Sequence, residues 1–143
     1  MASISNLWKQ ERENNLYKSI EDKTYNYFDR LDTKEKNEII IDNEVVKLDY
    51  REGQHNFALE FLETIKKNKI LLIQAGVGIG KSYGYLIPIF YTIDGLKNAK
   101  NIRFNKVVIS TSNIALQYQL IRDINLLSKE LSIPLSAVIA KGV

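Results

Sequence analysis

The sequence predicts an α/β protein in which helices cover a parallel sheet. From residue 70 onward, short apolar runs typical of buried strands alternate with longer segments whose apolar residues recur at helical spacing. A glycine-rich turn joins the first of these runs to the helix that follows it. Because the elements occur in the order strand, helix, strand, helix, strand, the sheet is expected to be parallel, with right-handed crossovers.

The N-terminal part of the chain is predicted to be a helix followed by a hairpin. Apolar residues at three- and four-residue steps predict a helix over roughly residues 5–31: Leu16, Ile20, Tyr27 or Phe28, and Leu31. Its tyrosines are interpreted as an apolar helix face rather than as a platform for stacking bases. Two β-branched runs, residues 39–41 and 45–48, are separated by Asp-Asn and predict a short hairpin.

Six further elements are predicted after the hairpin. Helical spacing predicts three helices, within residues 57–65, 83–90 and 114–127. Continuous apolar runs predict three strands, at residues 70–73, 107–109 and 137–140. Pro88 lies inside the second of these helices and is expected to kink or shorten it. The chain is thus divided into an N-terminal segment, residues 1–49, and a strand–helix domain, residues 50–143.

Composition narrows the functional classes. The chain has 143 residues, enough for one domain with a core. It has no cysteine, which excludes disulfides, thiolate zinc sites and an iron–sulfur cluster held by this chain. No apolar run approaches the roughly 18–20 residues that span a bilayer, and the amino terminus turns polar too early for a signal peptide. A cytoplasmic protein without membrane contact is expected.

The net charge of +3 is unevenly distributed. Residues 1–50 carry 8 Lys/Arg and 11 Asp/Glu, whereas residues 51–143 carry 12 and 6. The basic excess therefore lies in the part of the chain that contains the glycine-rich turn. Two interpretations stay open, namely a solvated surface of scattered lysines and a face that binds nucleic acid.

The glycine-rich turn has the residues and the position of a phosphate-binding loop. It consists of Ala75, Gly76, Val77, Gly78, Ile79, Gly80, Lys81 and Ser82. Glycines let the backbone curl so that N–H groups point at a β-phosphate, and the free N–H groups of the next helix face the same anion. Lys81, the predicted catalytic residue, would reach the β- and γ-phosphates, and the Ser82 hydroxyl would bind Mg²⁺. The turn therefore predicts ATP binding; the alternative is a strand–helix turn that binds nothing.

Three blocks of residues extend this pattern beyond the loop. The first is residues 51–54, Arg-Glu-Gly-Gln. The second is the loop itself with residues 85–88, Tyr-Leu-Ile-Pro. The third is residues 107–111, Val-Val-Ile-Ser-Thr, with residues 116–120, Leu-Gln-Tyr-Gln-Leu, and Asp123. Many proteins with a phosphate-binding loop lack the third block, so it discriminates best.

Together the blocks resemble the N-terminal part of the first motor domain of DinG-like DNA helicases, which are bacterial relatives of XPD in helicase superfamily 2. The resemblance covers residues 50–142 and leaves residues 1–49 without a family function. It implies a partial RecA-like fold, a three-layer sandwich whose parallel sheet carries the phosphate-binding loop. Ala75 stands where the general loop pattern has glycine, and an alanine there is common in helicase-type ATPases.

The resemblance also implies roles for residues before the loop. In the Arg-x-x-Gln element of these helicases the glutamine reads the adenine edge and the arginine lies close by, which would make Gln54 and Arg51 nucleotide-binding residues. The alternative for Gln54 is an ordinary surface position. The single histidine, His55, is expected to be an exposed bystander rather than a ligand or a base.

The third block would contact single-stranded DNA in this family. Ser110, Thr111 and Gln117 are the predicted DNA-binding residues, since hydroxyls and backbone N–H groups at a helix start donate well to phosphate oxygens. The alternative is that Ser110, Thr111 or Asn113 caps the helix.

The family pattern is incomplete in these 143 residues. An acidic Asp-Glu-x-His motif that would hold Mg²⁺ is missing, as are the family's iron–sulfur cysteines and the second motor domain with its arginine finger. The expected function is the ATP-binding portion of a helicase that couples ATP hydrolysis to single-stranded DNA translocation, weak or inactive by itself. The alternative is a stand-alone interaction module. An exposed sheet edge is expected to mean either that the chain is a fragment of a longer protein or that a protein partner, self-association or the N-terminal segment covers that edge.

Overall fold

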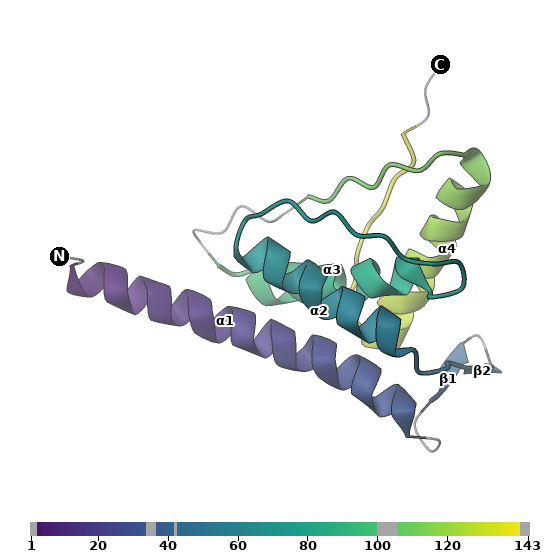
Figure 1. The fold of residues 1–143 in the computed structure, drawn as a ribbon, viewed down its shortest axis with the longest axis horizontal. Coiled ribbons are helices and arrows are strands. Elements are labelled where there is room, and N and C mark those ends of the chain that lie inside the picture. Colours follow the sequence, from purple (N-terminus) through teal and green to yellow (C-terminus); the bar gives the residue numbers. More distant parts are fainter. Residues whose placement is uncertain (1–2, 34–36, 42, 100–105, 141–143) are drawn as a thin grey trace.

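The computed structural model describes residues 3–33, 37–41, 43–99 and 106–140. This part of the chain is rich in helix and contains one small two-stranded sheet (Figure 1). The elements are α1 (Ile4–Asp29), the 3-10 helix η1 (Arg30–Asp32), β1 (Glu38–Ile41), β2 (Glu44–Lys47), α2 (Glu52–Lys66), α3 (Lys81–Leu96) and α4 (Ile114–Leu131). All four predicted helices are therefore confirmed. No described helix is long and apolar enough to cross a membrane.

Ser3 caps the N-terminus of the long helix α1, because its hydroxyl accepts a hydrogen bond from the backbone N–H of Asn6. Its C-terminal half is packed against the rest of the protein, where Tyr27 and Phe28 are buried. The N-terminal turns extend past α2 and α3, and Trp8 is exposed there (Figure 1). The burial of Tyr27 agrees with its interpretation as part of an apolar helix face.

The hairpin is confirmed as an antiparallel pair of β1 and β2, in which Ile39 pairs with Val46. Asn43 has a φ of 68°, a left-handed conformation that asparagine tolerates in tight turns. Ile39 is buried and β1 contacts α4, whereas all residues of β2 are exposed. The hairpin therefore contributes to the core through a single strand.

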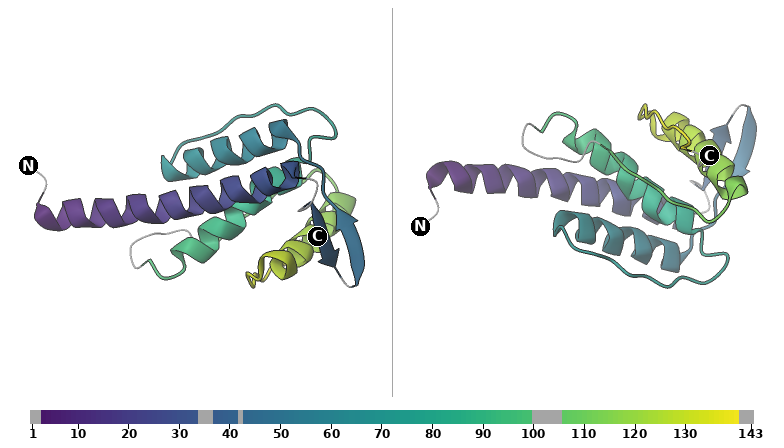
Figure 2. Two further views of the ribbon diagram at one scale, coloured as in Figure 1. Left: turned by 90° about the horizontal axis from the view of Figure 1, so that it is seen from below. Right: turned by 90° about the horizontal axis from the view of Figure 1, so that it is seen from above.

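Helices α1, α2 and α3 pack against one another (Figure 2). Two glycines of α3 permit the close approach. A Cβ atom on Gly84 would lie 2.6 Å from the Phe57 ring of α2, and one on Gly95 would lie 2.8 Å from the Ile20 side chain of α1. Any larger residue at these two positions would push the neighbouring helices away.

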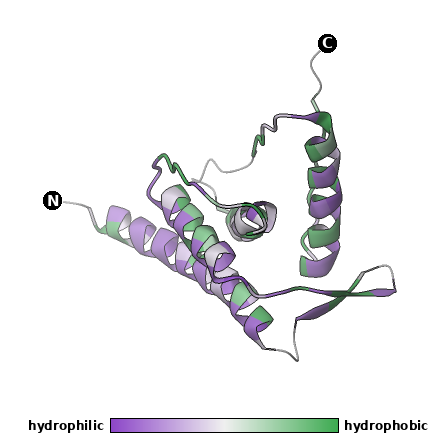
Figure 3. Cartoon of the chain, turned by 45° about the vertical axis from the view of Figure 1, so that its right-hand side comes forward, coloured by the Kyte–Doolittle hydropathy of each residue, from purple (hydrophilic) through white to green (hydrophobic). Residues whose placement is uncertain are grey.

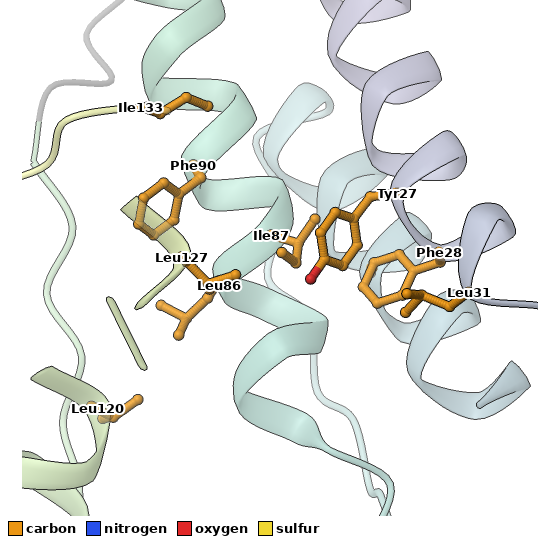
Figure 4. Packing of buried hydrophobic residues seen from close by; sticks show 10 residues of the cluster. Tyr27, Phe28, Leu31, Leu86, Ile87, Phe90, Leu120, Leu127 and Ile133 are labelled. Carbon is orange, nitrogen blue, oxygen red and sulfur yellow. The ribbon is translucent and has the colours of Figure 1, made fainter. Parts of the chain in front are cut away.

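The main core lies where α1, α3 and α4 meet (Figure 4). Its buried members are Tyr27, Phe28, Leu31, Ala58, Leu86, Ile87, Phe90, Leu120, Leu127 and Ile133. A smaller cluster of Ile20, Leu62 and Leu96 lies further along the helices. Apolar residues at helical spacing thus account for almost the whole core.

A buried polar group joins the end of α1 to the end of α4. The Glu130 carboxylate accepts hydrogen bonds from the Tyr27 hydroxyl, at 3.3 Å, and from the Arg30 guanidinium. Burial raises the pKa of Glu130, although Arg30 opposes this effect. Burial also raises the pKa of Tyr27. A charge-assisted hydrogen bond thus connects Arg30 and Glu130, which are 100 residues apart in sequence.

Pro88 does not shorten α3, which continues without interruption from Lys81 to Leu96. The Pro88 side chain is fully buried, and the Thr92 hydroxyl donates to the Pro88 carbonyl at 2.6 Å. Burial against the core therefore holds the helix together where proline removes a backbone donor.

The three segments expected to form a parallel sheet differ from the prediction. Residues 70–73, 107–109 and 137–140 have no strand pairing and are drawn in Figure 1 without arrows. Ile70 is 100% exposed and Val108 is 93% exposed. Apolar residues occur on these segments as well as on the helices (Figure 3). The described residues thus contain extended chain whose apolar side chains are mostly exposed, with Leu71 and Ile139 half-buried.

Candidate functional site

The predicted phosphate-binding loop leads directly into the first turn of α3. Gly78 and Gly80 have φ angles of 85° and 79°, left-handed values that strain any residue with a side chain. Gly80 is the N-cap residue of α3, and no side chain caps this end among the described residues. The first N–H groups of α3 are thus left without a side-chain acceptor, as an anion-binding helix start requires.

Three predicted site residues converge on the loop. The Lys81 ammonium donates to the Gly76 carbonyl at 2.9 Å, so its side chain folds back over the loop. The guanidinium of Arg51 donates to the Gly78 carbonyl, and the amide of Gln54 donates to the Gly80 carbonyl, both at 2.8 Å. The structure therefore brings together residues that lie up to 30 positions apart in sequence.

The contact between Gln54 and Gly80 is too close for another residue type at position 80. A Cβ atom on Gly80 would lie 2.3 Å from the Gln54 amide nitrogen. Gln54 is buried, which disagrees with the alternative of an ordinary surface position, whereas Arg51 is exposed. The Gln54 side chain in the first turn of α2 therefore lies directly against the backbone of the loop.

Ser82, the predicted magnesium ligand, lies half-buried in the first turn of α3. The pKa of the Tyr85 phenol, one turn further along α3, is raised chiefly by burial, and Ser82 opposes this effect. Burial also raises the pKa of the Asp123 carboxyl on α4. The described residues hold no group of three or more His, Asp or Glu side chains suited to a metal. Binding of Mg²⁺ by Ser82 stays a prediction.

The predicted DNA-binding residues lie before and within the first turn of α4. Asn113 caps this helix, since its side-chain oxygen accepts from the Leu116 N–H at 2.9 Å. Thr111 donates to the Asn113 carbonyl at 3.1 Å, and Ser110 is exposed. The side-chain oxygen of Gln117 is buried without a hydrogen-bond partner in the described structure. The capping alternative thus applies to Asn113, and DNA binding by the other three residues stays a prediction.

The expectation that His55 is exposed is wrong, because the residue is only 6% exposed. It follows Gln54 in α2 and is surrounded by Tyr25 and Phe28 of α1 and by Tyr50. Burial lowers the pKa of His55, although the Asp29 carboxylate opposes this effect. Sequence reasoning missed this residue because nothing in the spacing showed that α1 would cross the start of α2.

Comparison with known proteins identifies helicases as partial relatives. The chain is 38% identical over 93 residues to the ATP-dependent DNA helicase YoaA of Escherichia coli (strain K12), covering 64% of this chain and 13% of that protein. It is 32% identical over 83 residues to the probable ATP-dependent helicase MJ0942 of Methanocaldococcus jannaschii, covering 58% and 12%.

The chain therefore spans roughly an eighth of the length of the curated relatives that it matches. No protein-family model and no solved structure matches it. Over the matched part, the chain is related to proteins named as ATP-dependent helicases.

Proposed function

We propose that this chain is the ATP-binding N-terminal portion of a DinG-like DNA helicase, which in its complete form couples ATP hydrolysis to movement along single-stranded DNA. The observation that carries the proposal is the convergence of Arg51, Gln54 and Lys81 on one glycine-rich loop. The partial relationship to proteins named as ATP-dependent helicases supports it.

Each residue of the site has a role in this proposal. The Lys81 ammonium leaves the Gly76 carbonyl and neutralises charge on the β- and γ-phosphates. Backbone N–H groups of the loop and of α3 donate to the same phosphates. The Ser82 oxygen holds Mg²⁺, which supplies further charge neutralisation when bound. Gln54 would read the adenine edge and Arg51 would lie close to it, as the resemblance to these helicases implies.

The exposed extended segments support the fold part of the proposal. Residues 70–73, 107–109 and 137–140 are apolar and extended, and the first of them ends next to the loop. In the complete motor domain we expect them to pair as the parallel strands of a RecA-like sheet, because pairing would satisfy their backbone groups and cover their side chains.

A titration with the fluorescent analogue mant-ATP in the presence of Mg²⁺ tests nucleotide binding. Lys81→Ala is expected to weaken binding by about tenfold or more, because a charge-assisted contact to the phosphates is lost. Lys97→Ala is the matched control, since Lys97 is the lysine at the other end of α3 and pairs with Asp94. Equal affinities of the wild-type chain and Lys81→Ala would contradict the proposal.

Hydrolysis by this chain is expected to be weak. An arginine finger supplied by another domain is worth roughly 10³–10⁵ in rate in comparable enzymes. A steady-state ATPase assay with and without single-stranded DNA measures the rate of ATP hydrolysis by this chain. Brisk turnover that DNA stimulates and that Lys81→Ala abolishes would show that the chain completes its own catalytic site.

DNA contact is proposed for Ser110, Thr111 and Gln117. Ser110 is exposed and precedes the capped start of α4, where phosphate oxygens could meet hydroxyl donors. The double variant Ser110→Ala and Thr111→Ala is expected to weaken binding of a labelled oligonucleotide. Unchanged binding would remove these residues from the proposed interface.

The exposed apolar segments favour a second candidate, a stand-alone interaction module. Leu72 and Val138 are 97% and 92% exposed, which suits a surface that a protein partner covers. A stable complex that neither ATP nor Lys81→Ala alters would support this function over the helicase one.

A further inference from the structure

The first turn of α2 has two packed faces. One face points at the loop through Arg51 and Gln54, whose side chains donate to loop carbonyls. Gly53 belongs to the same face, since a Cβ atom placed on it would be 3.6 Å from the Ile79 side chain of the loop. The other face carries His55, which is directed at α1.

His55 is enclosed by aromatic rings from two other segments. Its ring stacks on Phe28, with centroids 5.4 Å apart and an interplanar angle of 24°, and its centroid is 4.9 Å from that of Tyr25. Its Nδ1 atom is hydrogen-bonded to the Tyr50 hydroxyl at 3.3 Å. Its Nε2 atom is buried without a partner in the described structure. The histidine is thus held by packing on α1 more than by hydrogen bonds.

We propose that His55 is a positioning residue of the nucleotide site, through which helix α1 fixes the turn that carries Arg51 and Gln54. This inference rests on the proposed function and adds the N-terminal helix to the parts that shape the same site. The backbone makes the connection direct, because the N–H groups of both Gln54 and His55 donate to the Arg51 carbonyl, at 3.0 and 3.1 Å.

The fit between α2 and the loop leaves little room for movement. A hydrogen bond at 2.8 Å is lost once its atoms separate beyond about 3.5 Å, so a shift of less than 1 Å in the first turn releases Gln54 from Gly80. The body of α2 is held elsewhere, by the contact of Phe57 with Gly84. Within the first turn itself, the His55 side chain contacts Tyr25 and Phe28 of α1.

Nucleotide affinity provides the first test. His55→Ala is expected to weaken mant-ATP binding by about tenfold, and His55→Phe, which keeps an aromatic ring between Phe28 and Tyr25, is expected to restore most of it. Leu62→Ala is the matched control, because Leu62 is buried on the same helix against the smaller cluster, away from the first turn. It should lower the thermal midpoint without changing affinity at a temperature where all variants are folded.

Two further variants separate positioning from general loss of stability. Tyr25 is 46% exposed, so Tyr25→Leu removes one of the aromatic rings around His55 with little risk to folding. Like His55→Ala, it should weaken mant-ATP binding. In a Gln54→Ala background, His55→Ala should cost clearly less affinity than in the wild-type chain, because part of its effect passes through Gln54. Full additivity of the two substitutions, or unchanged affinity of His55→Ala, would overturn the proposal.

Hydrogen exchange supplies a measurement that needs no nucleotide. Amides of the loop and of the first turn of α3 should exchange faster in His55→Ala and Tyr25→Leu than in the wild-type chain, and Leu62→Ala should leave them unchanged. If the wild-type chain does not bind mant-ATP, the proposed function fails, and this comparison still decides whether His55 positions the loop. Equal exchange in all four proteins would refute the positioning role.

Discussion

The helical core and the three extended segments contain similar apolar side chains in opposite surroundings. Phe90 of α3 is fully buried, in a cluster that also contains residues of α1, α2 and α4. Val108 and Ile70, on the extended segments, are almost completely exposed. Apolar character therefore does not by itself decide which residues are covered in this chain.

The difference lies in how each region satisfies its backbone. A helix forms its hydrogen bonds within one segment, so α1, α3 and α4 need only pack their apolar faces together. An extended segment needs a neighbouring strand for its N–H and C=O groups before its side chains can be covered. A helical segment can therefore form from its own residues, whereas a strand forms only beside another strand.

The largest effect is expected from breaking the helical core. Phe90→Ala should lower the free energy of unfolding by about 3–5 kcal/mol, because it leaves a cavity at a fully buried position. Urea denaturation followed by circular dichroism measures the change. A loss no larger than that of a surface substitution would mean that the core is not packed as described.

The close contact between α2 and α3 should be the next most sensitive feature. Gly84→Ala is expected to cost about 1–3 kcal/mol, because the added methyl group would lie 2.6 Å from the Phe57 ring. Phe57→Leu in the same chain should recover part of that loss by making room for the methyl group. If the double variant is simply additive, the two side chains do not share this contact.

A change of pH should affect the buried histidine by a smaller amount. Because burial lowers the pKa of His55 below its ordinary value of 6.5, its contribution to stability is complete above pH 6.5. It is lost as the pH falls through the folded-state pKa, at no more than about 1.4 kcal/mol per pH unit. His55→Phe removes this contribution, and the chain has no other histidine. Identical pH profiles for the two proteins between pH 7 and 5 would contradict the burial of His55.

The smallest effect is expected on the exposed segments. Leu72→Thr and Val108→Thr should each change the free energy of unfolding by less than about 0.5 kcal/mol, since both side chains are more than nine-tenths exposed. The same substitutions in a chain that includes the rest of the proposed motor domain should cost clearly more. That contrast would sharpen the distinction between the two regions.

The sequence predicted the helices well because each signal is local. Leu86, Ile87 and Phe90 have the spacing of one helix face, and all three are buried in α3. The strand segments show the limit of such reasoning, since an apolar run such as residues 70–73 indicates a tendency to pair but not whether a partner is present. Parallel pairing joins segments distant in sequence, which spacing cannot reveal.

The candidate site was predicted in part for the same reason. Lys81 belongs to the loop itself, and the resemblance to a helicase family points to Arg51 and Gln54, whose side chains contact that loop. His55 could not be found in this way, because its role depends on α1 crossing α2 at Tyr25 and Phe28. Contacts between elements outside one motif require the folded structure.

The proline within α3 has a mechanical consequence. Pro88 has no N–H group, so the Gly84 carbonyl does not receive the backbone hydrogen bond that residue 88 would normally donate. One backbone hydrogen bond of α3 is therefore missing. Helices bend most readily at such points. The end of α3 that bears Lys81 and Ser82 therefore keeps its direction through side-chain packing on both sides of the proline, at Leu86 and Phe90, and not through a continuous hydrogen-bond ladder.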